Sequence, residues 1–209
     1  KPAGQLSQGA KGFDLDLVSE VMTYNASQGK SAYAAIINRL DRPVSGLVLI
    51  AKNKSAAAKY STLMQKEGGF NKQYEALICG KLSEPKGTFV DYLKKDGRTN
   101  TSAVVPSDAA TNDKEAKLSK LEYEVISYDE VKDITHVRIH LITGRHHQIR
   151  VQFASRRHPL VGDYKYATAD CGMDNAVKAV AFKRNQIALC AVSLTVDNKT
   201  YSVAPEFLL

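Results

Sequence analysis

Hydrophobic residues recur at two spacings along this chain, and the first spacing predicts helices. Residues 13–24 carry apolar side chains three to four positions apart, as in an amphipathic helix, with Asp14 as the candidate N-cap. These apolar side chains are Leu15, Val18, Val21 and Met22. A second helix is predicted from a cap at Asn53 or Ser55 to about Glu67. Its predicted inner residues are Ala58, Leu63 and Met64, and its predicted end is Gly68-Gly69.

The second spacing is the two-residue alternation of β-strands, which dominates the middle of the chain. Residues 134–141 alternate most sharply. One predicted face carries Val137, Ile139 and Leu141, and the other carries His136, Arg138 and His140. Residues 89–93 and 99–105 flank an Asp96-Gly97 pair, which is typical of a hairpin turn.

The remaining pattern is rich in strands. Further strands are predicted at residues 34–37, 47–51, 72–80, 116–127, 187–190, 192–196 and 201–203. Residues 106–113 are small and polar, which predicts an exposed loop, and residues 167–185 predict a connection with a short helix. Asp197-Asn198 predicts a turn before the last strand. Many strands and few helices are typical of an α+β protein.

Length and composition fit one large domain, or a domain with a small appendage. The chain has 209 residues, and no stretch reaches the ~18–20 apolar residues that a membrane span requires. It begins without Met and without the apolar core of a signal peptide, which predicts a start partway through a longer chain. Three distant cysteines with no CxxC pair predict free thiols in a reducing cytoplasm.

The net charge changes the range of expected partners. A charge of +7 makes a polyanion, most simply nucleic acid, a plausible partner. Charge alone is weak evidence, because many basic proteins bind no nucleic acid. Neither the five histidines nor the cysteines have the spacing of metal ligands, so no metal is expected.

The strongest candidate for chemistry is Asp41, which stands between Arg39 and Arg42 in a segment broken by Pro43 and Gly46. Proline has no N–H for a sheet ladder, so a loop or tight turn is expected here. Neighbouring guanidinium groups favour an ionised carboxylate, which suits a nucleophile or a charge stabiliser. The other interpretation is a turn-capping aspartate between two solvated arginines.

The segment around Asp41 resembles the catalytic-aspartate motif of the RluA-type RNA pseudouridine synthases. It has Arg-Leu-Asp-Arg, two further residues, Ser-Gly and an aliphatic run. Three later segments resemble other motifs of this family in the expected order. They are residues 72–80 (Lys-x-Tyr-x-Ala-Leu-x-x-Gly), 143–151 (Thr-Gly-Arg-x-His-Gln-Ile-Arg-Val) and 158–166 (His-Pro-Leu-x-Gly-Asp-x-x-Tyr). Residues 1–4 resemble the Lys-Pro-x-Gly that ends the first strand of the family.

The resemblance implies a fold and a reaction. The implied fold is α+β, with a mixed, mostly antiparallel central sheet, flanking helices and an active-site cleft. Residues 1–209 would form a single catalytic domain whose N-terminal strand is missing or precedes residue 1. The implied reaction isomerises specific uridines to pseudouridine in ribosomal or transfer RNA. It involves no redox change or net hydrolysis, so no cofactor is expected, and the enzyme is expected to be a cytoplasmic monomer.

The resemblance also assigns roles to residues. Asp41 would act at the glycosidic carbon or the base, Tyr74 would lie against the uracil, and Arg150 would pair with the carboxylate. The residues assigned to substrate binding are Asn38, Arg39, Arg42, Arg145, His147, Gln148, Ile149 and Lys165. Arg156 and Arg157 are further candidates for phosphate contacts. From the residues alone, Tyr74 can also be a half-buried sheet tyrosine and Arg150 a solvated helix arginine.

Three residues depart from the pattern of the family. Asn38 stands where the family usually has His, and Asn cannot become cationic. Tyr164 and Ala167 replace the usual proline and glycine of the Gly-Asp motif.

The alternative functions are a non-catalytic RNA-binding protein with the same fold, and a hydrolytic glycosidase. A glycosidase usually requires two paired carboxylates, and the matched motifs supply no second acid beside Asp41.

Overall fold

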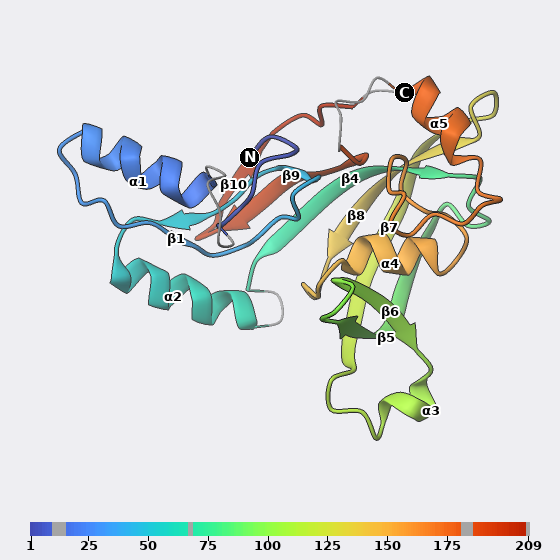
Figure 1. Cartoon of the computed structure of the whole chain (residues 1–209), viewed down its shortest axis with the longest axis horizontal. Helices are drawn as coiled ribbons and strands as arrows, with labels where there is room; N and C mark the ends of the chain where they lie inside the picture. The colour runs from blue at the N-terminus through green and yellow to red at the C-terminus, as the bar shows by residue number, and fades with distance from the viewer. Residues whose placement is uncertain (10–15, 67–68, 181–185, 208–209) are drawn as a thin grey trace.

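A strongly curved eight-stranded sheet organises the molecule (Figure 1). The computed structural model describes residues 1–9, 16–66, 69–180 and 186–207. The strand order along the sheet is β10-β9-β4-β8-β7-β5-β6, and β2 pairs with the other side of β9. The bounds are β2 Ser45–Gly46, β4 Asn71–Cys79, β5 Lys86–Asp96, β6 Thr101–Val105, β7 Lys117–Asp129, β8 Ile134–Leu141, β9 Leu189–Val196 and β10 Lys199–Ser202. Only β2 runs parallel to its neighbour, so the predicted mixed, mostly antiparallel sheet is confirmed.

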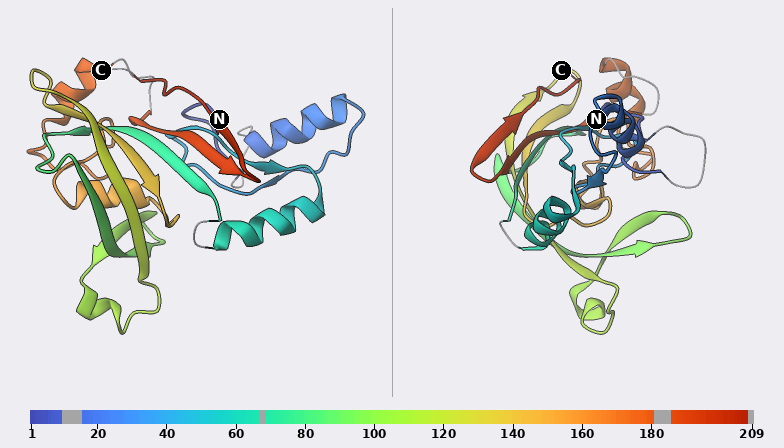
Figure 2. Two further views of the ribbon diagram at one scale, coloured as in Figure 1. Left: turned by 180° about the vertical axis from the view of Figure 1, so that it is seen from behind. Right: turned by 90° about the vertical axis from the view of Figure 1, so that its left-hand side faces the viewer.

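Helices and a small second ribbon flank this sheet. Strands β1 (Ala35–Ile36) and β3 (Ile50–Ala51) pair as a two-stranded ribbon. The helices are α1 Leu17–Ser27, α2 Lys54–Gln65, α3 Ser107–Ala110, α4 Gln148–Ala154 and α5 Met173–Ala179. Two opposite views place α1 and α2 beside the ribbon at one end of the molecule, with α4 and α5 toward the other end (Figures 1 and 2). The α4 helix packs against β5 and β6.

Packing against the hydrophobic core determines the position of α4, which contains the end of the motif at residues 143–151. The alternation predicted in β8 is confirmed, because Val137 and Ile139 are fully buried while Arg138 is exposed. On α4, Ile149 and Phe153 are both buried, as their four-residue spacing predicts. The Phe153 ring lies 5.1 Å from Phe89 and 5.9 Å from Tyr123, within the range of favourable aromatic packing.

The first helix begins later than its hydrophobic spacing predicts. It starts at Leu17, because the backbone of Asp16 is extended and its side chain accepts a hydrogen bond from the Ser19 N–H at 2.8 Å. The predicted cap Asp14 and the predicted inner Leu15 lie outside the described residues. Met22 was predicted to face inward and is 39% exposed, so the inner face of α1 was assigned incorrectly there.

The second helix follows its prediction more closely. Asn53 caps it by accepting from the Ala56 N–H at 2.8 Å. Leu63 and Met64 pack on the cluster around Phe70, but Ala58 is exposed, contrary to the prediction. The helix ends at Gln65 rather than at about Glu67. Glu67 and Gly68 lie outside the described residues.

The predicted strand 47–51 is wrong as one element. The Asn38 side chain accepts from the Leu49 N–H at 2.6 Å and donates to the Leu47 carbonyl at 3.2 Å. These side-chain bonds occupy the Leu47 carbonyl and the Leu49 N–H, which in one continuous strand would bond to a neighbouring strand. The chain therefore leaves the large sheet after Gly46 and joins the ribbon at Ile50. The predicted strand at 34–37 is only half-buried, since it contributes β1 to that ribbon.

The predicted loop at residues 106–113 and the predicted hairpin before it differ in outcome. Residues 107–110 form α3 within the predicted loop, and Ala110 is buried. The hairpin around Asp96-Gly97 is confirmed by the pairing of β5 with β6.

Near the C-terminus, residues 189–196 form one strand rather than two, since β9 runs continuously along β4 with a single register shift. Residues 181–185 lie outside the described part of the chain. Asp197 and Asn198 adopt left-handed backbone conformations and form the predicted turn.

Gly46 is the position where the Asp41 segment meets the large sheet most closely. Its φ is +120°, and a Cβ there would lie 2.4 Å from the Ala191 carbonyl oxygen and 2.5 Å from the Ala191 nitrogen. Both contacts are with backbone, which cannot move aside as a flexible side chain can. We expect Gly46→Ala to lower the free energy of unfolding by at least about 2 kcal/mol.

Urea denaturation would measure this loss, with Gly97→Ala as the matched control. A Cβ at Gly97 meets no atom within 4 Å, and its φ is not in the left-handed region. Equal unfolding midpoints for the two variants would show that β2 is not held against β9 as closely as this geometry requires.

Candidate active site

A basic cavity of about 810 Å³ lies between the Asp41 turn, β4 and the segment leading into α4. All of the residues to which the sequence assigned catalysis or substrate binding line this cavity. They are Asn38, Arg39, Asp41, Arg42, Tyr74, Arg145, His147, Gln148, Ile149, Arg150 and Lys165. The fold therefore brings together segments that are up to 127 residues apart, from 38 to 165.

Asp41 lies in a turn that is anchored on both sides. Leu40 and Val44 are buried, and the Val44 N–H donates to the Asp41 carbonyl at 3.0 Å. The Ser7 hydroxyl donates to the Leu40 carbonyl at 2.7 Å and accepts from the Leu40 N–H at 3.1 Å. The predicted turn is confirmed, and it presents the Asp41 carboxylate, about one-third exposed, to the cavity.

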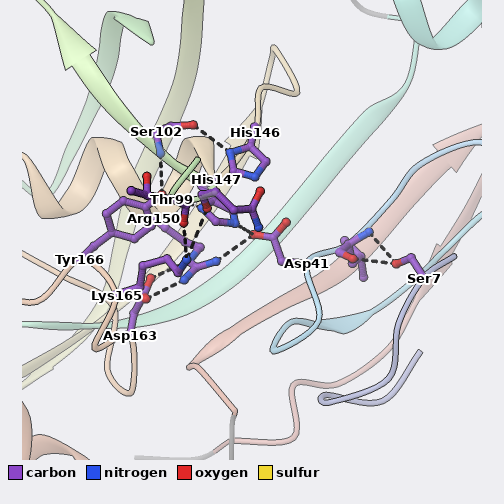
Figure 3. A network of polar contacts seen from close by, with 12 residues as sticks. Ser7, Asp41, Thr99, Ser102, His146, His147, Arg150, Asp163, Lys165 and Tyr166 are labelled. Atoms are coloured by element: carbon purple, nitrogen blue, oxygen red, sulfur yellow. Dashed lines mark hydrogen bonds and ion pairs between the residues drawn. The ribbon is translucent and has the colours of Figure 1, made fainter. Parts of the chain in front are cut away.

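Arg150 lies between two carboxylates (Figure 3). Its Nη1 is 3.2 Å from Asp41 Oδ2, so the structure contains the contact that the resemblance implied. Its Nε and Nη2 bind the two oxygens of Asp163 at 2.6 and 2.7 Å, in a bidentate pair. Burial opposes the charge on Arg150, but the hydrogen bonds and charge of Asp163, with the charge of Asp41, outweigh it and raise the pKa of the guanidinium.

His147 lies on the other side of the Asp41 carboxylate. Its Nε2 is 3.5 Å from Asp41 Oδ2, and its Nδ1 is 2.5 Å from the Tyr166 hydroxyl. Burial, and then the charge of Arg150, lower the pKa of His147 to about 3, so the imidazole is neutral at neutral pH.

The geometry of the histidine pair 146–147 depends on where α4 begins. Within a helix, adjacent residues do not share a face. Here α4 begins at Gln148, and His147 has a left-handed backbone with φ +52°. The two imidazole rings consequently stack with centroids 3.8 Å apart.

Tyr74 and Ile149 belong to the apolar part of the cavity lining. Tyr74 projects from β4 and is 7% exposed, and Ile149, from the first turn of α4, is 4% exposed. Burial, followed by the charge of Asp41, raises the pKa of Tyr74, so its phenol is neutral at neutral pH. A neutral aromatic ring and an aliphatic side chain in one cavity offer apolar surface suited to a planar base.

Several predicted substrate-binding side chains are engaged with the chain itself. Gln148 accepts from the Thr143 hydroxyl and the Arg145 N–H, and its amide donates to the Lys120 carbonyl. Asn38 bridges the backbone of residues 47 and 49, as described above. These groups shape the cavity, and their assignment to RNA contacts stays a prediction.

The predicted basic contacts differ in how accessible they are. Arg39 and Lys165 are exposed, although Lys165 Nζ lies 3.4 Å from the Thr99 and Asn100 carbonyls. Arg156 makes a two-contact ion pair with Asp91 at 3.0 Å and lies over the Phe89 ring. Arg156 is therefore a poor candidate for a phosphate contact, while Arg39 and Lys165 retain accessible charge.

Sequence reasoning missed the roles of three residues that shape the site. The sequence placed Asp163 and Tyr166 only within the motif at residues 158–166. Lys72 was noted only as the first residue of the strand motif, although two-residue alternation places it on the same face as Tyr74. That alternation was the available signal for Lys72, whereas the contact of Asp163 with Arg150 depends on tertiary structure.

The fold defines the class of protein. Human RNA pseudouridylate synthase domain containing 4 has a similar structure, with a TM-score of 0.76 over 98% of this chain and 83% of that chain. The sequence identity is 17%, so this likeness concerns the fold alone. The chain thus has the fold of a pseudouridine synthase domain.

Sequence comparison defines the family. Residues 1–155 match the family described as RNA pseudouridylate synthase. Ribosomal large subunit pseudouridine synthase D of Blochmanniella floridana is 36% identical over 138 residues, which are 65% of this chain and 39% of the relative. The protein of the same name from Buchnera aphidicola subsp. Acyrthosiphon pisum (strain APS) is 32% identical over 168 residues, 80% of this chain and 50% of the relative. The chain belongs to the RNA pseudouridylate synthase family, whose members are isomerases.

Three further observations concern the chain as a whole. The chain spans half or less of the length of these two curated relatives. Within the residues that the structure describes, no helix is long and apolar enough to cross a membrane. The same residues contain no group of three or more His, Cys, Asp or Glu side chains arranged to hold a metal ion.

Proposed function

We propose that this chain isomerises uridine to pseudouridine in RNA, with Asp41 as the reacting carboxylate. The observation that carries the proposal is the Asp41–Arg150 contact inside a basic cavity that also holds Tyr74 and Ile149. Each of these four residues lies in a segment that resembles a motif of this family. The two relatives described above are named ribosomal large subunit pseudouridine synthases, so large-subunit ribosomal RNA is the proposed substrate.

The proposed reaction breaks the bond between uracil N1 and ribose C1′ and forms a bond between C5 and C1′. The proton lost from C5 balances the proton gained at N1, so no oxidant, reductant or water is consumed. Asp41 can add to the sugar, assist elimination from it, or add to the base. Arg150 contacts the carboxylate and orients it in each case, while Tyr74 and Ile149 hold the base as it turns.

The RNA must present its target uridine outside a helix, because the reacting carboxylate lies inside a cavity. Extrusion of a base costs a few kcal/mol, which contacts with the surrounding phosphates can offset. Exposed cations that line the cavity, among them Arg39 and Lys165, are placed to make such contacts. Phosphate contacts of this kind position RNA without reading its sequence.

Mass-spectrometric mapping of pseudouridine in cellular RNA tests the proposal. The gene is deleted and then restored as wild type or as Asp41→Ala. We expect one or a few sites to disappear on deletion and to return only with the wild-type gene. If no site changes while the purified protein binds RNA, a non-catalytic RNA-binding role replaces the enzyme proposal.

Lys72 is proposed as a further contact for the RNA backbone. Its side chain lines the cavity and is only 9% exposed, and Nζ lies 3.9 Å from the Met64 sulfur. Among the described residues it has no ion pair with a carboxylate, and burial lowers its pKa. A partly desolvated cation without an acidic partner is costly to the free protein and favourable toward an entering phosphate.

We expect Lys72→Met to weaken RNA binding and to reduce the slope of log affinity against log salt by about one. The unfolding free energy of this variant should stay the same or rise, because a buried charge is removed. Fluorescence anisotropy at several salt concentrations measures the slope. Lys199→Met, at an exposed position of β10 outside the cavity, is the matched control. An equal salt slope in both variants would remove Lys72 from the RNA-binding surface.

A further inference from the structure

A continuous chain of polar contacts leads from β6 to the Asp41 carboxylate (Figure 3). The Ser102 N–H donates to the Tyr166 hydroxyl oxygen at 2.9 Å. The same hydroxyl lies 2.5 Å from His147 Nδ1, and His147 Nε2 lies 3.5 Å from Asp41 Oδ2. Three elements that are distant in sequence are thus connected to one oxygen of the reacting group.

The directions of the two hydrogen bonds, from Ser102 to Tyr166 and from Tyr166 to His147, follow from the first donor. A backbone N–H can only donate, so the Tyr166 oxygen accepts from Ser102. Its own proton is then free to point to His147 Nδ1. In the opposite arrangement Nδ1–H would donate to a tyrosine oxygen that already accepts, and the Nε2 lone pair would face the Asp41 carboxylate. Two electron-rich atoms facing each other are repelled, so the first arrangement has the lower energy.

The protonation state of His147 completes this assignment. The imidazole is neutral at neutral pH, because burial and the adjacent Arg150 oppose its charge. A neutral imidazole carries one N–H, and the other nitrogen accepts. Since Nδ1 accepts from Tyr166, the N–H is on Nε2 and faces Asp41.

We propose that Tyr166 is a positioning residue that fixes His147 in its Nε2–H tautomer, and that His147 and Arg150 together hold Oδ2 of Asp41. Within the described residues, the polar contacts of the Asp41 side chain with Arg150 and His147 all involve Oδ2. The other oxygen, Oδ1, is therefore the one left for the reaction. Its role in the reaction rests on the proposed function, but the tautomer does not.

Holding one oxygen from two sides restricts rotation of the carboxylate. A reacting atom that is misplaced by about 1 Å can cost about 100-fold in rate. The Tyr166 ring also lies against Arg150, with 5.1 Å from the guanidinium carbon to the ring centroid. A phenylalanine at this position keeps that packing and removes only the hydroxyl.

The experiment compares Tyr166→Phe with Tyr164→Phe. The control removes a hydroxyl two residues away that is exposed and bonded to Asp174 at 3.0 Å. ¹⁵N NMR of the histidine side chains should show His147 as Nε2–H in the wild type and in Tyr164→Phe. In Tyr166→Phe we expect a mixture of tautomers, a kcat about 10- to 100-fold lower, and an unchanged KM for RNA.

A second pair of variants separates positioning from folding. Gln at residue 147 offers a side-chain N–H to Asp41 without a tautomer to be fixed. We therefore expect His147→Gln to retain more activity than His147→Leu, and Tyr166→Phe to cost little further in the His147→Gln background. Thermal unfolding of each variant reports any loss of the fold.

The outcomes distinguish this proposal from the proposed function. An Nδ1–H tautomer in the wild type, or a tautomer and kcat unaffected by Tyr166→Phe, would overturn the positioning role. A wild-type protein that forms no pseudouridine in any RNA would refute the proposed function. The NMR measurement would still decide the tautomer in that case, since it requires no substrate.

Discussion

Asp41→Asn is expected to abolish pseudouridine formation while leaving the protein folded and able to bind RNA. Loss of a reacting group of this kind typically lowers kcat by at least about 10⁴-fold. The amide is nearly the same size as the carboxylate but cannot serve as its charge or nucleophile. RNA affinity should stay the same or rise, because the variant removes a negative charge from the cavity that is proposed to bind RNA.

The surroundings of Asp41 explain why the fold should survive this change. Arg150 keeps its bidentate pair with Asp163, so the buried guanidinium is not left without a carboxylate. The turn is held by the backbone bond from Val44 and by Ser7, neither of which uses the Asp41 side chain. The stability lost should therefore be small compared with the activity lost.

The measurement is pseudouridine formation in transcribed large-subunit RNA, quantified by mass spectrometry alongside RNA affinity. Asp108→Asn removes the same charge at an exposed position of α3 outside the cavity and serves as the control. Activity of Asp41→Asn within tenfold of wild type would exclude Asp41 as the reacting group. Joint loss of activity and RNA binding would point to a disrupted site instead.

The sequence predicted those parts of the fold in which local pattern and tertiary packing agree. The alternation in residues 134–141 and the spacing of Ile149 and Phe153 describe faces that the core does bury. Asn53 and the Asp96-Gly97 turn act through local hydrogen bonds and backbone geometry, which neighbouring residues determine. Such signals need no knowledge of distant contacts.

The incorrect secondary-structure predictions lie where a side chain from another segment determines the local backbone structure. Residues 47–51 have the composition of a strand, but the Asn38 side chain takes two of their backbone groups and divides the segment. The same contacts give Asn38 a structural role that its comparison with the usual histidine did not suggest. Local propensity contains no information about such a partner.

The sequence also predicted the candidate site only in part, because motif positions carry no information about tertiary contacts. Motif positions identified the residues that line the cavity, including Asp41, Tyr74 and Arg150. They did not identify Asp163 as the main partner of Arg150, or Tyr166 as the partner of His147. Those contacts depend on how the loop after α4 returns to the helix, which no single segment of sequence specifies.

Arg150→Met is expected to cause the largest loss of stability in this site. Arg150 and Asp163 are 6% and 1% exposed at the side chain, so removing the cation leaves Asp163 buried without its partner. Breaking a buried pair in this way typically costs about 3–5 kcal/mol. Activity should be lost as well, because Asp41 also loses its contact with the guanidinium.

The double variant Arg150→Met with Asp163→Asn separates these two losses. It removes both buried charges, and replacing both members of a buried pair is often close to neutral for stability. We therefore expect urea denaturation to show that most of the lost stability returns, while pseudouridine formation does not. Recovery of both would mean that Arg150 only balances Asp163. Recovery of stability alone would separate the two contacts of Arg150, with Asp163 supporting the fold and Asp41 supporting the reaction.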